Sequence, residues 1–241
     1  MNSIHEPQFA WFFWSLILIL IWVVIYILLK NKESKREMLI VSLLTALTGL
    51  AEPLFIPGYW SPPSLFDLAH RTGFDIESVI FSFGTGGIAV VIYELIFKKS
   101  HEKILAFRRN EHHHRLHIFA LLSTPLMFLV LFFTTDWNII YSVIVSMTLG
   151  GLFAWYCRPD LKKKMFASAF IFFWIYFIYF ITLIALYPGY VEQVWNLKAI
   201  SGILILGIPL EELLFALSFG FLWSSIYEHI TWRKLTRKLT H

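Results

Sequence analysis

The sequence predicts an all-α, polytopic membrane protein with about seven transmembrane helices. Of its 241 residues, 58% are hydrophobic and 18% aromatic, while 15% are charged, against roughly 25% in a soluble domain. The apolar residues fall into seven runs, each near the ~20 residues that cross a hydrocarbon core of ~30 Å. The net charge of +4 does not indicate nucleic acid as a partner, because the basic residues are spread over short connections between these runs.

The expected spans follow one another with short connections. The run at 9–29 is too long for the apolar core of a signal peptide, so it is expected to be a first spanning helix. The single cysteine, Cys157, excludes an intrachain disulfide and is expected in the core. The remaining spans are predicted at 38–56, 74–97, 118–134, 138–157, 165–187 and 207–229.

The basic residues orient these spans. Eighteen of the 20 Lys and Arg residues follow spans one, three, five and seven, which leaves Arg71 and Lys198 for the other side. Because cytoplasmic loops are enriched in basic residues, we expect an integral protein of the cell (inner) membrane with its N-terminus out and its C-terminus in.

Several polar and aromatic residues near the span ends have ordinary expected roles. Glu94 and Glu228 lie beside basic loops and are expected to be ion-paired. The histidine tract at 112–114, near His117, is expected to be a solvated loop rather than a metal site. Four aromatic residues are expected in the outer interfacial belt: Tyr59, Trp60, Tyr190 and Trp195.

An internal repeat divides the chain. Pro-Gly-Tyr occurs at 57–59 and again at 188–190. We therefore expect a first three-helix repeat at 1–100, a basic loop and linking helix at 101–137, and a second three-helix repeat at 138–241. Four spans separate equivalent positions, so the repeat is parallel. A shift of 134 residues aligns eight identical residues of the two repeats. They are Gly73, Glu77, Phe81, Gly86, Ile92, Tyr93, Glu94 and Ile96 in the first, and Gly207, Glu211, Phe215, Gly220, Ile226, Tyr227, Glu228 and Ile230 in the second.

Acidic residues lie near the outer ends of three spans. Carboxylates are costly inside a membrane, so each is a candidate for a functional site. Asp75 could instead cap a helix, and glutamates after Pro209 could meet a helix dipole. Acids at the starts of both equivalent helices favour a shared cavity, in which a neutral acid beside a carboxylate can perform acid–base chemistry. The five candidate catalytic residues are Glu52, Asp75, Glu77, Glu211 and Glu212.

The run at 208–215, Ile-Pro-Leu-Glu-Glu-Leu-Leu-Phe, resembles the Pro-x-Glu-Glu motif of the small membrane-embedded lycopene cyclases of bacteria, archaea and fungi. The resemblance carries over Pro209, Glu211 and Glu212 in the second repeat and Glu77 alone in the first. Phe81 and Phe215, which the internal repeat matches, are expected to be structural positions. It implies a carotenoid end-group cyclase, an isomerase-type enzyme that closes a β-ring on a linear polyene without net redox change. Lipid and polyene are the expected partners, a homo-oligomer is possible, and we expect no cofactor and no metal.

Two other functions stay open on the sequence. A non-catalytic carotenoid-binding relative would keep the fold and lose turnover, and the first repeat has Asp-Ile-Glu-Ser at 75–78 in place of a Pro-x-Glu-Glu motif. A proton or cation transport protein would also use membrane acids, although here the middle of each span is free of them.

Overall fold

The computed structural model describes residues 7–104 and 117–237 and confirms an all-α membrane protein. Within these residues, seven helical segments are long and apolar enough to cross a membrane. Their helices are α1 (Pro7–Leu28), α2 (Lys32–Ala46) continued by the 3₁₀ helix η2 (Leu47–Leu54), α4 (Ile76–Phe97), α5 (His117–Thr134), α6 (Ile139–Cys157), η6 (Pro159–Leu161) continued by α7 (Lys162–Leu186), and α9 (Leu210–Trp223) continued by α10 (Ile226–Thr231).

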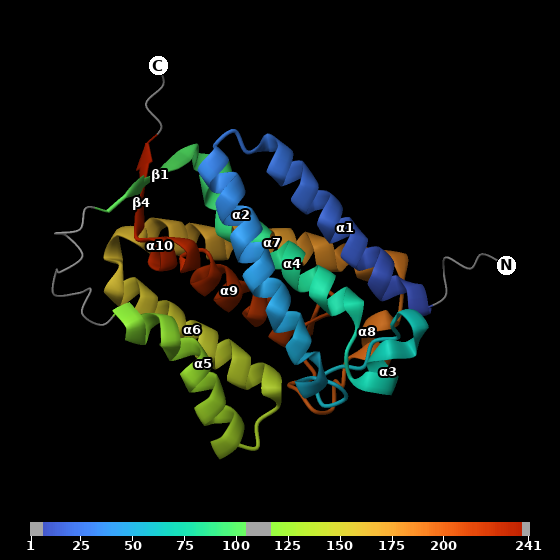
Figure 1. The fold of residues 1–241 in the computed structure, drawn as a ribbon. Coiled ribbons are helices and arrows are strands. Elements are labelled where there is room, and N and C mark those ends of the chain that lie inside the picture. The colour runs from blue at the N-terminus through green and yellow to red at the C-terminus, as the bar shows by residue number, and fades with distance from the viewer. Residues whose placement is uncertain (1–6, 105–116, 238–241) are drawn as a thin grey trace.

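Helices α4 and α9 lie at the centre of the bundle (Figure 1). They are the most buried spans, with 61% and 67% of their most apolar stretch inside the protein. Helices α1 and α2 pack on α4, whereas α6 and α7 pack on α9. Helix α5 packs along α6 at the edge, and Ala120 is its one fully buried residue, so this helix exposes more of its side chains to lipid than the other spans do.

A reciprocal contact joins α1 to α7 in the aromatic core. The rings of Trp14 and Tyr179 stack with centroids 4.1 Å apart. The Trp14 indole Nε1 donates to the Tyr179 carbonyl at 3.0 Å, and the Tyr179 hydroxyl donates to the Trp14 carbonyl at 2.8 Å. Both polar groups are therefore satisfied at full burial, which the low-dielectric interior requires.

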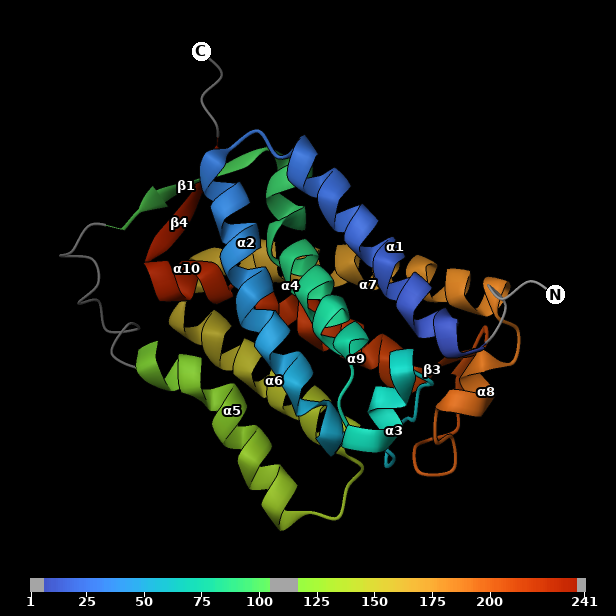
Figure 2. The same cartoon turned by 45° about the vertical axis from the view of Figure 1, so that its right-hand side comes forward.

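Short elements close the two ends of the bundle (Figure 2). One end, called here the outer end after the predicted orientation, carries η3 (Leu65–Asp67), α3 (Leu68–Thr72), α8 (Tyr190–Val194), β2 (Leu204–Ile205) and β3 (Ile208–Pro209). The opposite, inner end carries β1 (Lys99–Lys103) and β4 (Arg233–Arg237), which pair antiparallel, while β2 pairs with β3.

Pairings at both ends join the two halves of the predicted repeat. In the β1–β4 ladder His101 lies opposite Leu235, a separation of the same 134 residues that aligns the helices. At the outer end an isolated antiparallel bridge joins Trp60 to Trp195. A two-fold relation between the halves would bring equivalent strands together in this way; the repeat itself stays a prediction.

Two spans begin earlier than the sequence predicts. Helix α2 starts at Lys32 rather than at residue 38, with the Asn31 side chain accepting from the Glu33 N–H at 2.9 Å as its N-cap. Span six was expected from 165, yet Lys162 already begins α7. Charged residues in these first turns were interpreted as loop. They are helical because Glu37 and Lys164 pair with each other inside the protein.

Candidate active site

A cavity of about 480 Å³ lies between η2, α4, α5, α6 and α9. It extends along α9 from Glu212, in the first turn of that helix, to His229 of α10 near the inner end. Its ionisable acids and histidine lie toward its two ends, with Glu52 and Glu212 at one and His229 at the other. Aromatic side chains form much of the wall: Trp11, Phe55, Phe81, Tyr176, Phe215 and Phe219.

The cavity reaches the surface of the bundle between η2 and α5. Thr48 of η2 and Pro125 of α5 both line it, and both are exposed. The surface around this opening is apolar: Leu47 and Leu50 of η2 are 63% and 57% exposed, and Leu126 of α5 is 52% exposed. In a membrane such a surface contacts lipid tails, so the opening faces the bilayer rather than water.

Glu212 is the acid held most firmly at the outer end of the cavity. Its Oε1 accepts from the Tyr59 hydroxyl at 2.5 Å and from the Trp195 indole Nε1 at 2.9 Å. Its Oε2 accepts from the Tyr176 hydroxyl at 2.5 Å. All three donors are neutral and come from three different parts of the chain. They can stabilise a carboxylate without an ion pair.

The pKa of the Tyr59 phenol, which lies in the loop after η2, is well above its usual value. Burial is the largest cause, and the neighbouring Glu212 charge adds to it. The phenol therefore stays protonated and remains a donor to Glu212 over the physiological pH range.

Glu52 is the second acid in the cavity wall. It is 7% exposed, and its Oε1 has no hydrogen-bond partner among the described residues. Its electrostatic neighbours include Asp75 and Trp60. Gly49 sets its position: a Cβ there would lie 2.8 Å from the Ser78 carbonyl oxygen, so η2 approaches the start of α4 only with glycine at this place.

The four aromatic residues expected in an interfacial belt are buried instead. Tyr59 and Trp195 are each 4% exposed, Tyr190 is 3% exposed and Trp60 is 9% exposed. The belt prediction is wrong because the loops after η2 and α8 fold inward and bridge at Trp60 and Trp195, whose ring centroids are 5.4 Å apart. This pair separates the site from the outer surface, with Trp60 beside Glu52 and Trp195 bonded to Glu212.

Asp75 serves as the N-cap of α4. Its Oδ1 accepts from the Ser78 N–H at 2.5 Å and from the Trp11 indole at 3.4 Å. Burial raises the pKa of Asp75, and the bond from Ser78 opposes that rise. Asp75 therefore caps a helix, which is the alternative that its sequence position left open.

Glu77 and Glu211 hold loops at the outer end. Glu77 Oε1 accepts from the Leu65 N–H at 2.8 Å, and Glu211 Oε1 accepts from the Ser201 N–H at 2.9 Å and from the Tyr141 hydroxyl at 2.7 Å. Each glutamate thus fixes the loop that precedes its own helix. Of the five candidates, Glu52 and Glu212 line the cavity, and no described contact joins Glu77 to Glu211.

Residues 137–230 match the family model described as lycopene cyclase. This segment, which is less than half of the chain, is similar to the lycopene cyclase family. It contains Pro209, Glu211, Glu212 and Phe215, whereas Glu52, Asp75, Glu77 and Phe81 lie before it. No curated protein and no solved structure matches the chain.

The match supports a carotenoid cyclase-type function in general terms. Within the matched segment, Pro209 is the buried N-cap of α9, and Phe215 lines the cavity one turn beyond Glu211. Phe81 of α4 lines the same cavity, with its ring centroid 5.3 Å from that of Trp11.

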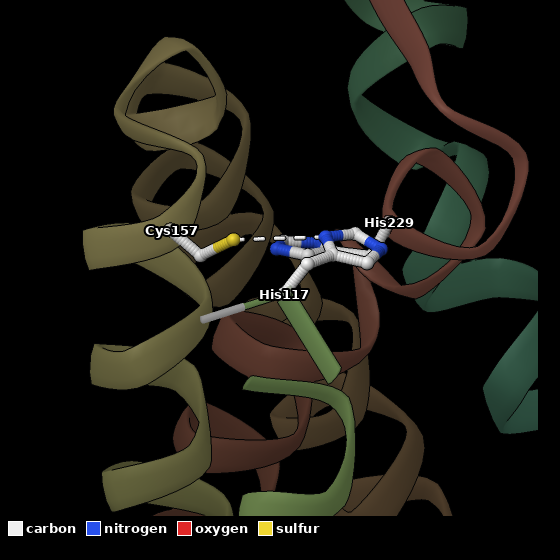
Figure 3. Close-up of side chains that lie close together, drawn as sticks. All are labelled: His117, Cys157 and His229. Carbon is white, nitrogen blue, oxygen red and sulfur yellow. Dashed lines mark hydrogen bonds between the residues drawn. The ribbon is translucent and has the colours of Figure 1, made fainter. Parts of the chain in front are cut away.

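At the inner end of the cavity, Cys157 and His229 of the matched segment lie beside His117 (Figure 3). Cys157 is fully buried, as expected of a core residue. His117 begins α5 rather than lying in a loop, and its ring stacks on Trp232 with centroids 4.0 Å apart. The tract at 112–114 lies outside the described residues.

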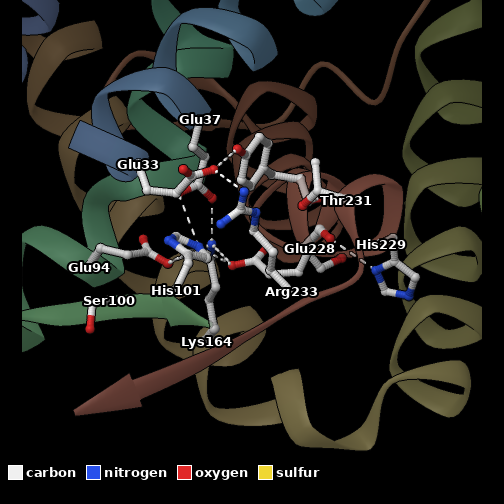
Figure 4. A network of polar contacts seen from close by, with 12 residues as sticks. Glu33, Glu37, Glu94, Ser100, His101, Lys164, Glu228, His229, Thr231 and Arg233 are labelled. Carbon is white, nitrogen blue, oxygen red and sulfur yellow. Dashed lines mark hydrogen bonds and ion pairs between the residues drawn. The ribbon is translucent and has the colours of Figure 1, made fainter. Parts of the chain in front are cut away.

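A second acidic cluster lies at the inner end (Figure 4). The Lys164 amino group is 3.0 Å from a carboxylate oxygen of Glu37 and 2.7 Å from oxygens of both Glu94 and Glu228. His101 Nε2 also approaches Glu228 at 3.0 Å. The prediction that Glu94 and Glu228 are ion-paired is confirmed.

Sequence reasoning missed Lys164 and Glu37, although a signal was present. Lys164 lies four and eight residues before Ser168 and Phe172, which are buried on the same face of α7. Extending the helical period backwards would have placed the lysine on the buried face. The charge was instead assigned to a basic loop.

Proposed function

We propose that the chain is a carotenoid end-group cyclase that closes a β-ring on a linear, lycopene-type polyene by acid–base catalysis without net redox change. The observation that carries the proposal is the placement of two carboxyl groups, Glu52 and Glu212, at one end of an aromatic cavity that opens toward lipid. Glu212 lies in the segment that matches the lycopene cyclase family model.

Glu52 is the proposed proton donor. A buried neutral carboxyl tolerates an oxygen without a partner far better than a buried carboxylate does, and Glu52 Oε1 has none among the described residues. Two carboxyl groups in one apolar cavity cannot both ionise cheaply, so one keeps its proton. Delivery of this proton to the terminal double bond of the polyene leaves a tertiary carbocation.

Glu212 is the proposed base. Attack of a neighbouring double bond on the first cation closes a six-membered ring and moves the positive charge to a ring carbon. Removal of a proton from the adjacent carbon by Glu212 then forms the ring double bond. Three neutral donors, Tyr59, Trp195 and Tyr176, hold this carboxylate. One proton enters and one leaves, so the product is an isomer of the substrate.

The wall of the cavity suits the cationic intermediate. Rings of Trp11, Phe81, Tyr176 and Phe215 line it, and aromatic faces stabilise cations by about 0.5–2 kcal/mol each. They also exclude the water that would trap the cation as an alcohol. The opening between η2 and α5 would admit an apolar substrate directly from the bilayer.

Expression in cells that accumulate lycopene tests the proposal. We expect the wild type to form cyclic carotenoids, and Glu52→Gln and Glu212→Gln each to leave the lycopene unchanged while accumulating normally in the membrane. Glu102→Gln is the matched control, because its carboxylate is exposed at the inner end beside Lys234. Equal pigment conversion by wild type and both cavity variants would refute the acid–base assignment.

A carotenoid-binding relative without turnover is the second candidate. The Asp-Ile-Glu-Ser sequence at 75–78, where the first repeat lacks the Pro-x-Glu-Glu motif, favours it. Co-purification of unchanged lycopene with the wild type, under conditions in which a working cyclase forms rings, would support binding over catalysis.

We also propose the orientation with the N-terminus out. Both probe sites are exposed: Lys103 in β1 at the inner end, and Phe66 at the outer end. In a Cys157→Ala background, a membrane-impermeant thiol reagent added to intact cells should label Phe66→Cys and spare Lys103→Cys. The reverse pattern would invert the orientation.

A further inference from the structure

We propose that His117, Cys157 and His229 form a binding site for one divalent transition-metal ion, with Zn²⁺ the best fit. The three residues come from the start of α5, the end of α6 and α10. One ligand atom from each lies within 4.8 Å of the other two (Figure 3). This departs from the expectation, drawn from the sequence, that the protein holds no metal.

The spacing of sulfur and nitrogen fits a tetrahedral ion. Cys157 Sγ lies 3.6 Å from His117 Nδ1. Two ligands at the usual Zn–S distance of ~2.3 Å and Zn–N distance of ~2.0–2.1 Å are about 3.5 Å apart in tetrahedral geometry. The pair is thus already at the separation that one shared ion would impose. Trp232, stacked on the His117 ring, fixes its plane.

The hydrogen bond of His229 sets the tautomer that a metal requires. Its Nδ1 lies 2.9 Å from the Ser225 carbonyl oxygen, which can only accept, so Nδ1 carries the proton. Nε2 then bears a lone pair. This atom is buried and has no hydrogen-bond partner among the described residues, and the residue is 2% exposed. A histidine whose other nitrogen donates to a backbone carbonyl is the common arrangement of a metal ligand.

The donor set selects the class of ion. Two imidazoles and one thiolate suit Zn²⁺ and similar soft or borderline ions, and not Mg²⁺ or Ca²⁺. Binding would remove the thiol proton of Cys157. The nearby Arg158 is paired with Asp160 through two bonds, at 2.8 and 2.7 Å, so its charge is compensated.

The other cluster of potential ligands at this end differs. Glu37, Glu94, His101 and Glu228 also converge within 4.8 Å. There the Lys164 ammonium lies within 3.0 Å of all three carboxylates and takes the place of a metal ion. No such cation contacts Cys157 or His229 among the described residues.

An ion at this site would join α5 to the rest of the bundle. Helix α5 is the least buried span, and it borders the opening of the cavity through Pro125. A metal bond from its first residue to α6 and α10 would fix its inner end. His229 also lines the cavity, so the ion would close the inner end, opposite the two carboxyl groups.

Cobalt binding tests the site. The full chain, purified in detergent with a tag free of histidine and stripped with chelator, is titrated with Co²⁺. We expect about one Co²⁺ per chain in tetrahedral coordination, with a thiolate-to-cobalt charge-transfer band and displacement by Zn²⁺. Cys157 is the chain's one thiol, so this band reports the proposed site and no other histidine cluster.

Matched variants decide the outcome. Cys157→Ser should abolish the charge-transfer band, and His229→Gln should weaken Co²⁺ binding by at least about tenfold. His70→Gln, at the outer end, should bind as the wild type does. As a measurement that needs no variant, Zn²⁺ should protect the Cys157 thiol of the wild type from alkylation. A wild type without the band and without protection would overturn the proposal, as would a band of equal strength in His229→Gln and wild type.

Discussion

Two groups of buried acids lie at opposite ends of the same bundle, and their partners differ in kind. At the inner end, Glu37, Glu94 and Glu228 surround the Lys164 ammonium. At the outer end, Glu212 is held by two phenols and an indole. Among the described residues, none of the five buried acids at the outer end (Glu52, Asp75, Glu77, Glu211 and Glu212) forms a salt bridge. Position in the membrane alone therefore does not tell what an acid does.

The partners and the surroundings together separate structural acids from chemical ones. The inner carboxylates surround a cation and connect α2, α4, α7 and α10. Their charges are compensated by ion pairs that stabilise the packing of these helices. The outer pair, Glu52 and Glu212, faces a cavity and has no cationic partner among the described residues, so a proton can be gained or lost there. Four predictions test this division, from the largest expected effect to the smallest.

The largest effect is expected when a glutamate is replaced by glutamine at each end of the bundle and the two variants are compared. Glu212→Gln should lower ring formation by about 10²–10⁴-fold, the usual contribution of general acid–base catalysis, and leave the thermal midpoint close to that of the wild type. Glu228→Gln should do the opposite, lowering the midpoint while each folded molecule keeps its activity. Pigment yield per folded protein and thermal unfolding in detergent measure both. Loss of activity in both variants with no change in stability would end the distinction.

Lys164→Met should destabilise the protein by about 3–5 kcal/mol, because three buried carboxylates lose their cation. Adding Glu94→Gln to this variant should restore part of the loss by removing one of the uncompensated charges. The midpoint of unfolding measures each. An unchanged midpoint in the single variant would show that the inner cluster does not stabilise the bundle.

Tyr59→Phe should lower ring formation roughly tenfold to a hundredfold, because a hydrogen bond to a charged group contributes about 1.5–3 kcal/mol. The pocket keeps its shape, and Glu212 keeps its bonds from Tyr176 and Trp195. Tyr26→Phe, whose ring stacks on Trp22 near the inner end, is the control and should have no effect. If both variants cyclise as the wild type does, Glu212 does not depend on this donor.

Glu211→Gln should have the smallest effect, a loss of ring formation of about fivefold or less. Glutamine still accepts from the Ser201 N–H, and a neutral acceptor is weaker than a charged one by about 1 kcal/mol. Full loss of activity, as in Glu212→Gln, would show that Glu211 takes part in the chemistry and that its role goes beyond holding a loop.

Much of the fold could be predicted from the sequence because hydropathy is local. All seven spans agree with the structure at one end or both within about three residues, and only the starts of the second and sixth spans lie farther off. The start of α2 could not be placed, because it depends on Glu37 meeting Lys164, 127 positions away. A charge that will be paired across helices looks the same in sequence as a charge in a loop.

The acids of the site could be named from sequence, but their directions could not. Glu211 and Glu212 are neighbours, and the rotation of α9 between its two flanking helices decides which one faces the cavity. Glu211 meets Tyr141 of α6, whereas Glu212 meets Tyr176 of α7. Tyr59 and Trp195 were predicted to lie at the membrane surface. Their burial could not be predicted, because the inward folding of the outer loops depends on tertiary contacts.

Because the opening between η2 and α5 faces lipid, the concentration that matters for the proposed polyene substrate is its concentration in the membrane, not in the buffer. A polyene that enters there has already partitioned into the bilayer and arrives by lateral diffusion, so its mole fraction in lipid sets the rate of encounter. Empty vesicles added at constant total substrate would then slow turnover by surface dilution, provided that the polyene exchanges between vesicles, although the concentration per volume of buffer is unchanged. Bilayer thickness and acyl-chain order, which act on helix α5 and its exposed leucines, would modulate the same rate.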